Sequence, residues 1–317
     1  MKNNNRKNII FLTLMLVLSF AIIRSGNGNN NIDSRKQPKF VSVDFSHAAY
    51  SDDGINWEDT TLPNKNLWDS VTYGNGKFAA IASSGSDKAL YSNDGIKWKT
   101  TVMPKKSYWT NICYGNGKFV AVAALSATAA YSKDGINWKA ATMPKKDYWT
   151  SICYGNGKFV AVAVYSDTAA YSNDGIKWVE TTMASINRWQ SVCYGNGKFV
   201  AVSFTNESAY SEDGIEWKAA TLPCIAYWQS VCYGNGMFVA IANESNNAAY
   251  SKDGINWKAA TLPDEAAWKS LCYGDGKFLA VATGTGTEAA YSGDGIKWTK
   301  IEWLLGWGCR SVCYGGD

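Results

Sequence analysis

The chain has 317 residues, with 29 glycines, 6 prolines and 14% aromatic residues, a turn-rich composition that supplies enough apolar material for a core and excludes a disordered chain. The formal net charge is +4, but the first 25 residues hold four basic side chains and no acidic one, and without them 27 basic and 27 acidic residues remain. A neutral main part excludes the strongly basic surface of a nucleic-acid-binding protein and offers no patch for acidic lipids.

Residues 1–25 predict a secretory signal peptide. Lys2, Arg6 and Lys7 precede the apolar run 9–23, and a Gly/Asn-rich stretch follows. The run is shorter than the about 20 residues that a membrane span needs, so an uncleaved anchor is the alternative. No cysteine follows it, which argues against a lipid-modified N-terminus. We expect 26–38 to be a flexible polar linker, and the protein to be secreted or at the cell surface with no other membrane contact.

The rest of the chain repeats one unit of about forty residues. The octapeptide Tyr-Ser-x-Asp-Gly-Ile-x-Trp begins at Tyr50, Tyr91, Tyr131, Tyr171, Tyr210, Tyr250 and Tyr291. A regular period of 20 to 50 residues is typical of solenoids, propellers and other repeat arrays. Residues recurring in every copy are therefore expected to build the repeat, and function is sought where the copies differ.

One copy, residues 149–182, predicts four short strands. Residues 149–154 and 158–163 are rich in β-branched and apolar residues, and Gly155-Asn-Gly157 between them favours a tight hairpin. A polar link, 165–168, leads to a third strand at 169–172, and the Asp-Gly turn leads to a fourth at 177–182. Four antiparallel strands in forty residues are typical of one propeller blade.

The two chain ends predict how the ring closes. The last copy stops after one strand, 311–317, whereas residues 39–43 and 48–57 supply the other three strands of a copy. Joined, they make one blade, which with six internal copies gives seven. The prediction is an all-β, seven-bladed propeller over 39–317, with four-stranded antiparallel blades and N-terminal strands paired to the C-terminal strand.

The repeated Ser-x-Asp-Gly-Ile-x-Trp resembles the Asp-box, or BNR repeat, of the sialidase-like β-propeller superfamily, in a variant one residue shorter that lacks the family's Thr. In that family the box forms the turn between the third and fourth strands of a blade. The resemblance implies a structural role for the repeated Asp and Trp side chains, namely Asp53, Asp94, Asp134, Asp174, Asp213, Asp253, Asp294, Trp57, Trp98, Trp138, Trp178, Trp217, Trp257 and Trp298. A metal array or a set of catalytic carboxylates is the alternative for the aspartates.

The same resemblance does not carry sialidase catalysis over to this chain. Sialidases use three arginines, a Tyr–Glu pair and an acidic Asp on six blades. Beyond the leader this chain has only Arg35, Arg188 and Arg310, and no Arg-Ile-Pro motif. The single histidine, His47, has no motif partner for a metal site or a triad. We therefore expect no catalysis, no cofactor and no metal; paired carboxylates formed by folding are the remaining route to a glycoside-active enzyme.

Six of the eight cysteines occupy one repeat position, where the first copy has Thr72; they are Cys113, Cys153, Cys193, Cys232, Cys272 and Cys313. We expect them to pack between blades rather than form disulfides, because equivalent positions on neighbouring blades should be too far apart for a bridge. Cys224 and Cys309 lie outside the pattern and could pair.

The links on one face of the ring vary between copies, whereas the turns on the opposite face are nearly identical, so binding is expected at the variable face. Drift in tolerant loops is the alternative. Aromatic residues near the start of the inner strands are the candidate ligand-binding residues: Trp68, Trp109, Trp149, Trp189, Trp228, Trp268, Tyr108, Tyr148, Tyr227 and Trp307. Aromatic rings near a channel mouth can stack on sugars, but packing between blades is the other interpretation of the tryptophans.

These features predict a secreted, non-catalytic, monomeric propeller that binds a glycan through its variable face. The second hypothesis is an extracellular protein-interaction or surface scaffold. The third is a glycoside-active, sialidase-like enzyme.

Overall fold

Antiparallel pairing of strands organises the part of the chain that the computed structural model describes, residues 40–284, 288–302 and 306–316. No helix occurs among these residues, and therefore none that could cross a membrane. The prediction of an all-β fold is confirmed. The predicted signal peptide, 1–25, and linker, 26–38, lie outside the described residues.

The strands pair into five sheets. The first has the order β25 (Ser311–Tyr314), β1 (Phe40–Val43), β2 (His47–Ser51) and β3 (Glu58–Thr61). The second contains β4 (Trp68–Gly74), β5 (Lys77–Ala82), β6 (Ser86–Ser92), β7 (Lys99–Gly115), β8 (Lys118–Ala124), β9 (Ser126–Ser132) and β10 (Lys139–Asp147). The third contains β11 (Trp149–Gly155), β12 (Lys158–Ser172), β13 (Val179–Gly195), β14 (Lys198–Ser203), β15 (Glu207–Ser211) and β16 (Lys218–Thr221). The fourth contains β17 (Tyr227–Gly234), β18 (Met237–Asn243), β19 (Ser245–Ser251) and β20 (Lys258–Ala266), and the fifth contains β21 (Trp268–Gly274), β22 (Lys277–Ala282), β23 (Glu288–Ser292) and β24 (Thr299–Glu302).

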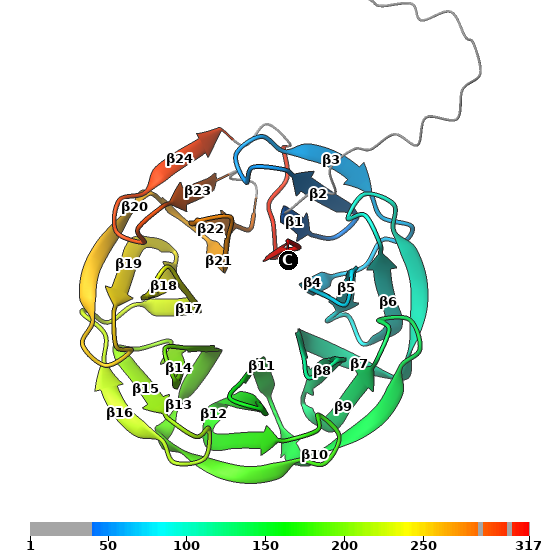
Figure 1. Cartoon of the computed structure of the whole chain (residues 1–317), viewed down its shortest axis with the longest axis horizontal. Helices are drawn as coiled ribbons and strands as arrows, with labels where there is room; N and C mark the ends of the chain where they lie inside the picture. The colour runs from blue at the N-terminus through cyan, green and yellow to red at the C-terminus, as the bar shows by residue number, and fades with distance from the viewer. Residues whose placement is uncertain (1–39, 285–287, 303–305, 317) are drawn as a thin grey trace, which may run out of the picture. The chain divides into compact units, whose positions relative to one another are not determined.

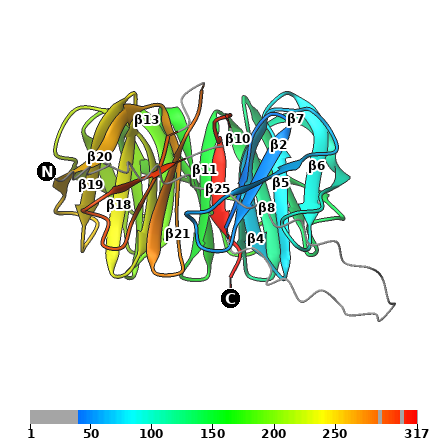
Figure 2. The same ribbon diagram turned by 90° about the horizontal axis from the view of Figure 1, so that it is seen from above.

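The sheets stand around a central axis, with β4, β11 and β21 near the centre and β3, β16 and β24 at the periphery (Figure 1). The strands run across the thickness of the ring, so their connections lie on two opposite faces (Figure 2). At the two ends of the described chain, β25 pairs antiparallel with β1, with Cys313 opposite Val41.

Several links between the predicted strands are extended and paired. Strand β7 runs for 17 residues through the link 103–108, and β12 runs through the predicted polar link 165–168. Neighbouring links pair with each other, as in Ser86 with Ser107 and Val164 with Arg188. Pairing satisfies backbone groups of both links and gives them an ordered shape.

The opposite face carries the repeated turns with the predicted chemistry. Asn156 and Gly157 have φ of 45° and 75°, the left-handed values that a tight hairpin requires. In the first box, Asp53 accepts hydrogen bonds from the backbone N–H groups of Ile55 and Asn56, both at 2.8 Å. Partial burial raises the pKa of this carboxyl, but hydrogen bonds from Asn56, Ile55 and Ser51 outweigh that effect and lower the pKa to about 2.

The same Asp hydrogen bonds recur in all seven boxes, which supports the structural interpretation of the repeated aspartates. In two boxes the tryptophan also closes the turn: the indole N–H of Trp57 and of Trp98 donates to the carbonyl of the glycine three residues earlier, each at 3.1 Å. Hairpin and box turns also touch, since the Asn116 side chain donates to the carbonyl of Asn173 at 3.4 Å. We call this side the turn face.

The core lies between neighbouring sheets. One cluster joins Val120 and Val122 of β8 to Trp149 and Phe159 of the next repeat, and another joins Phe40 of β1 to Leu279 of β22. Each interface is closed at its inner edge by a tyrosine on a glycine: a Cβ added to Gly155 would overlap the ring of Tyr194. The same pair recurs at Gly74, Gly115, Gly195, Gly234 and Gly274 with the tyrosine of the following inner strand.

This packing predicts that Gly155→Ala is strongly destabilising. The added methyl group must displace either Tyr194 or the strand, at a cost of about 1–3 kcal/mol or more in a packed core. Urea unfolding followed by fluorescence measures the loss. Gly293→Ala is the control, because a Cβ at Gly293 meets no atom within 4 Å. Equal stability of the two variants would contradict the assigned contact.

Candidate functional site

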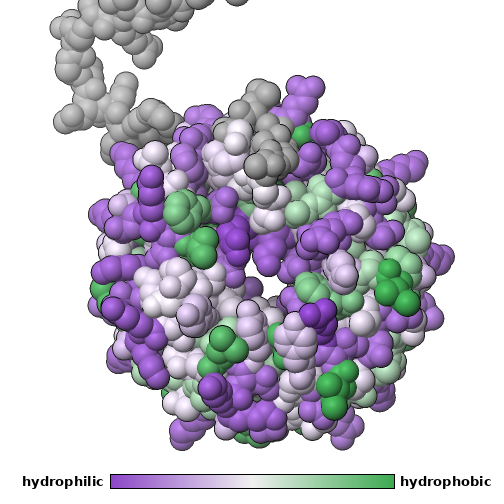
Figure 3. Space-filling view, turned by 180° about the vertical axis from the view of Figure 1, so that it is seen from behind, coloured by the Kyte–Doolittle hydropathy of each residue, from purple (hydrophilic) through white to green (hydrophobic). Residues whose placement is uncertain are grey.

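The inner strands present a ring of polar side chains to the central channel. In six repeats, two polar residues follow the tryptophan at the start of the inner strand, as in Trp189-Gln190-Ser191, and in the seventh Arg310 and Ser311 follow Cys309. Together with Tyr148 they line a cavity of about 180 Å³. Its lining residues are Asp69, Thr110, Asn111, Tyr148, Thr150, Ser151, Gln190, Ser191, Gln229, Ser230, Lys269, Ser270, Arg310 and Ser311. The space-filling view shows an opening at the centre of the ring with hydrophilic residues around it (Figure 3).

In six of the seven repeats the second polar residue ties neighbouring inner strands together. The hydroxyl of Ser151 accepts a hydrogen bond from the backbone N–H of Val192 at 3.1 Å. Equivalent bonds run from Ile112 to Ser70, from Ile152 to the Asn111 carbonyl oxygen, from Val231 to Ser191, from Val312 to Ser270 and from Val71 to Ser311. These serines are therefore structural.

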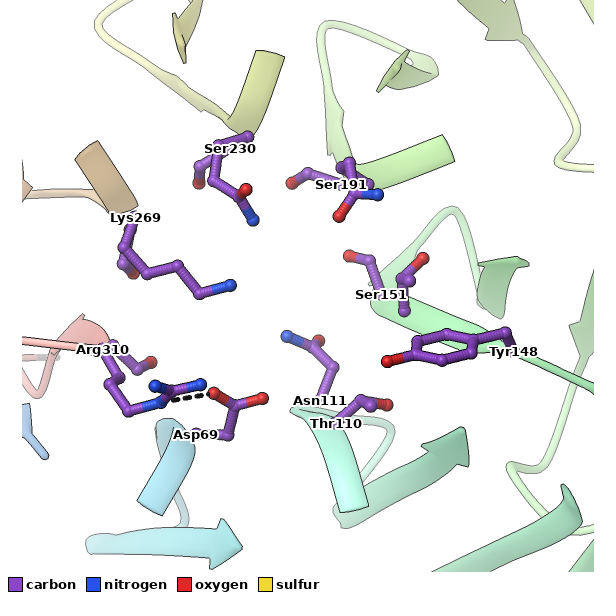
Figure 4. A pocket seen from close by; sticks show the side chains of 14 residues that line it. Asp69, Thr110, Asn111, Tyr148, Ser151, Ser191, Ser230, Lys269 and Arg310 are labelled. Carbon is purple, nitrogen blue, oxygen red and sulfur yellow. Dashed lines mark hydrogen bonds and ion pairs between the residues drawn. The ribbon is translucent and has the colours of Figure 1, made fainter. Parts of the chain in front are cut away.

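The first of these two polar residues differs in charge between repeats, and this charge distinguishes one side of the channel from the other. Four of the seven are uncharged, namely Thr110, Thr150, Gln190 and Gln229, and the other three are Lys269, Arg310 and Asp69. The charged three come from β21, the residue preceding β25, and β4, which are neighbours around the ring (Figure 4). The Asp44 carboxylate also interacts with Arg310 and Asp69, so the two cations of this sector have two carboxylates near them.

The two cations of this cluster are held differently. The Arg310 Nε donates to Asp69 Oδ1 at 2.8 Å, and both side chains are mostly buried. The Lys269 side chain reaches toward the middle of the channel, and no described residue makes a hydrogen bond or an ion pair with its ammonium group (Figure 4). Burial lowers the pKa of Lys269, with Arg310 adding to that effect and Asp69 opposing it.

The side that bears this cavity is built by the links, which we call the link face. It comprises the links between repeats, 62–67, 103–108, 143–148, 183–188, 222–227 and 262–267, and the links within repeats, 44–46, 83–86, 124–126, 164–167, 204–206, 243–245 and 283–284. Tyr108, Tyr148 and Tyr227, three predicted ligand-binding residues, are exposed here. Their role in binding stays a prediction.

The predicted ring of ligand-stacking tryptophans needs correction. Trp68, Trp109, Trp149, Trp189, Trp228 and Trp268 are all 0% exposed, so they offer no ring face to a ligand. Their indoles lie between the sheets, and five of them donate to the carbonyl four residues earlier, as from Trp149 to Lys145 at 3.4 Å. Trp307 is half-buried and stacks on His47, with ring centroids 5.3 Å apart.

All eight cysteines are free thiols, as expected for the six in the repeat. Each of those six packs against a different core cluster. Burial raises the pKa of these thiols, and also of Cys309. The suggested pairing of Cys224 with Cys309 does not occur. Within the described ranges, no group of three or more His, Cys, Asp or Glu side chains could hold a metal ion.

The fold places the protein among the β-propellers, and solved structures agree. Virginiamycin B lyase from Staphylococcus aureus, solved with quinupristin, has a TM-score of 0.69 at 12% identity, over 77% of this chain and 87% of that one. A streptogramin B lyase has a TM-score of 0.68 at 11% identity, over 84% and 89%. YCF48 bound to a D1 peptide has a TM-score of 0.52 at 15% identity, over 71% and 82%. No protein-family model and no curated protein matches the sequence.

These similarities correct the expectation of no catalysis and limit what the Asp-box resemblance implies. The sequence predicted no catalysis, but two of the similar propellers are lyases, so this fold is one that enzymes use. At 11–12% identity the likeness shows the fold alone. Because no family model matches, the likeness to the Asp-box is limited to the sequence of the turn.

The cluster of Lys269, Arg310 and Asp69 was not predicted, although the repeats contain a pattern that points to it. Aligning the copies on the inner tryptophan puts these residues in one column, in which every other copy is uncharged. The prediction considered the aromatic residue of each copy and did not consider the charged residue next to it.

The isolation of Lys269 predicts that Lys269→Met stabilises the protein. The variant removes a desolvated cation, and a gain of about 1 kcal/mol would raise the Tm by roughly 2–4 °C. Because folding lowers the pKa of Lys269, the charged form is penalised in full at low pH. The difference in Tm should therefore shrink as the pH rises toward about 10.4, the pKa of an unfolded lysine. A lower Tm for the variant at neutral pH would show that Lys269 is structurally required.

Proposed function

We propose that this protein is an interaction propeller that binds a polypeptide segment of a partner across its link face, at the mouth of the channel. The observation that carries the proposal is the distribution of exposed apolar side chains. Of the eleven large hydrophobic residues exposed in the described part of the chain, nine lie on the link face: Phe45, Leu67, Tyr108, Leu125, Tyr148, Tyr165, Ile186, Ile225 and Tyr227. Surface gathering of this kind is typical of interaction sites.

Backbone conformation supports the same assignment. Leu125 and Tyr165 have φ of 56° and 62°, a left-handed conformation that costs a non-glycine residue roughly 1–2 kcal/mol. Both side chains are more than half exposed, and Tyr165 is held by Arg188, whose guanidinium lies over its ring at 4.7 Å and donates to its hydroxyl. Strain at an exposed bulky residue is a feature of functional sites.

A polypeptide accounts for these side chains better than a glycan does. The buried tryptophans cannot stack on sugar rings, and Leu125, Ile186 and Ile225 are aliphatic. YCF48, a propeller of similar fold, was solved with a peptide, which is support by analogy only. The predicted leader extends the proposal to a monomer acting outside the cell or at its surface.

The proposal includes a closed ring of seven four-stranded blades. It is supported by strand pairings that fall into seven four-stranded groups, counting β7, β12 and β13 by segments, and by the pairing of β1 with β25. Closure is further supported by the hydrogen bond from the Val71 N–H to the Ser311 hydroxyl, at 3.1 Å.

Ring closure predicts that Ser311→Ala destabilises the protein by about 1–3 kcal/mol, because it leaves the buried Val71 N–H without its acceptor. Thermal unfolding measures the change. Ser230→Ala is the matched control, since the Ser230 hydroxyl has no hydrogen-bond partner among the described residues. An unchanged Tm for Ser311→Ala would contradict the proposed closure.

Binding at the link face is tested by selecting peptides from a random library against the wild-type protein. We expect micromolar peptides whose affinity falls at least tenfold, or about 1.4 kcal/mol, in an Ile186→Ser/Ile225→Ser variant. The control is Val179→Ser, which removes an exposed side chain at the end of an outer strand that follows a turn of the turn face. Failure to select any peptide, equal loss in both variants, or binding on a glycan array alone would overturn the proposal.

A further inference from the structure

We infer that the central cavity is a carboxylate site, and that Lys269 anchors the C-terminal carboxylate of the bound polypeptide. The identity of the occupant as a polypeptide rests on the proposed function; the capture of a carboxylate does not. The inference begins from the one charged sector of the channel, formed by Lys269, Arg310 and Asp69.

The Lys269 ammonium group has no ion-pair partner, although it lies in the channel where a charged group is partly desolvated. Its side chain is partly buried in the channel, and no described residue forms an ion pair with it. Arg310 is paired with Asp69, at 2.8 Å, and also interacts with Asp44, so Lys269 is the cation of this cluster without an ion pair (Figure 4). An unpaired cation that is partly withdrawn from water is unfavourable, and four other repeats place Thr or Gln at this position, so the fold does not need a lysine here.

The neighbours of Lys269 suit a planar, singly charged anion. The amides of Asn111, Gln190 and Gln229 line the same cavity and can donate hydrogen bonds to carboxylate oxygens. The Asp69 and Asp44 carboxylates near the cations reduce the local positive charge, which disfavours a phosphate with its charge of nearly two. Charge-assisted hydrogen bonds of this kind are among the stronger polar contacts.

The size and position of the cavity favour a chain end. At about 180 Å³ it is smaller than the roughly 300–1,000 Å³ of typical small-molecule pockets. It lies at the start of the inner strands, on the side where the apolar link-face residues are exposed, and Tyr148 belongs to both surfaces. A polypeptide lying across the link face can therefore place its last residue in the channel, with its preceding side chains on Ile186, Ile225 and the tyrosines.

The test uses two small probes, N-acetylglycine and N-acetylglycine amide, titrated into the full propeller and followed by NMR. We expect N-acetylglycine to bind with a millimolar Kd and the amide to show no saturable shift. Lys269→Met should weaken N-acetylglycine at least tenfold. The charge-matched control Lys133→Met, on the turn face, should stay within twofold of wild type. The Tm of each variant establishes that it is folded.

Other outcomes separate this inference from the proposed function. If selected peptides bind equally well as acids and as C-terminal amides, the carboxylate site is overturned while peptide binding stands. If no peptide is selected but N-acetylglycine binds through Lys269, the proposed function fails and the anion site stands. Tighter binding of glucuronate or inorganic phosphate than of N-acetylglycine would overturn the assignment to a polypeptide terminus.

Discussion

The face of a tyrosine ring against a backbone glycine determines how closely the inner strands of this protein approach one another. Tyr194 occupies the space that a side chain at Gly155 would need, and the same pair recurs between successive repeats. With the strands at this separation, a short serine side chain can accept a hydrogen bond from the next strand, as Ser151 does from Val192. The central channel therefore has a wall of hydrogen-bonded strands, and the residues before each serine are free to differ.

Because the residue before each serine can differ between repeats, functional side chains can arise at this position. Residues that build the sheets are nearly identical between repeats because they serve the same contact each time. The residue after each inner tryptophan projects into the channel and is not needed by the interface, except where Thr110 and Thr150 bond to the next strand. Lys269, Arg310 and Asp69 use this position for charge, while the links above carry apolar side chains on an ordered framework.

Features set by neighbouring residues could be predicted from the sequence, and those set by distant residues could not. The Asn156-Gly157 hairpin and the Asp53 turn follow from local backbone preferences, so both were predicted correctly. The burial of Trp149 depends on the neighbouring sheet, and sequence could not distinguish it from exposure at a channel mouth. Lys269 and Asp69 are 200 positions apart in the sequence, and only the pairing at the chain ends places β25 between their strands and brings both residues to one side of the channel.

The cysteines also allow local opening of this fold to be followed by thiol labelling. Each of the six repeat thiols packs at a different interface, and burial keeps it in the unreactive protonated form. Those six side chains are partly exposed, whereas Cys309 is 1% exposed, so a thiol reagent can modify Cys309 only while the structure around it is transiently open. The backbone N–H of Cys309 donates to the carbonyl of Ala282, and the next residue bonds to Val43, so the rate of labelling would report local opening beside the paired chain ends without any engineered probe.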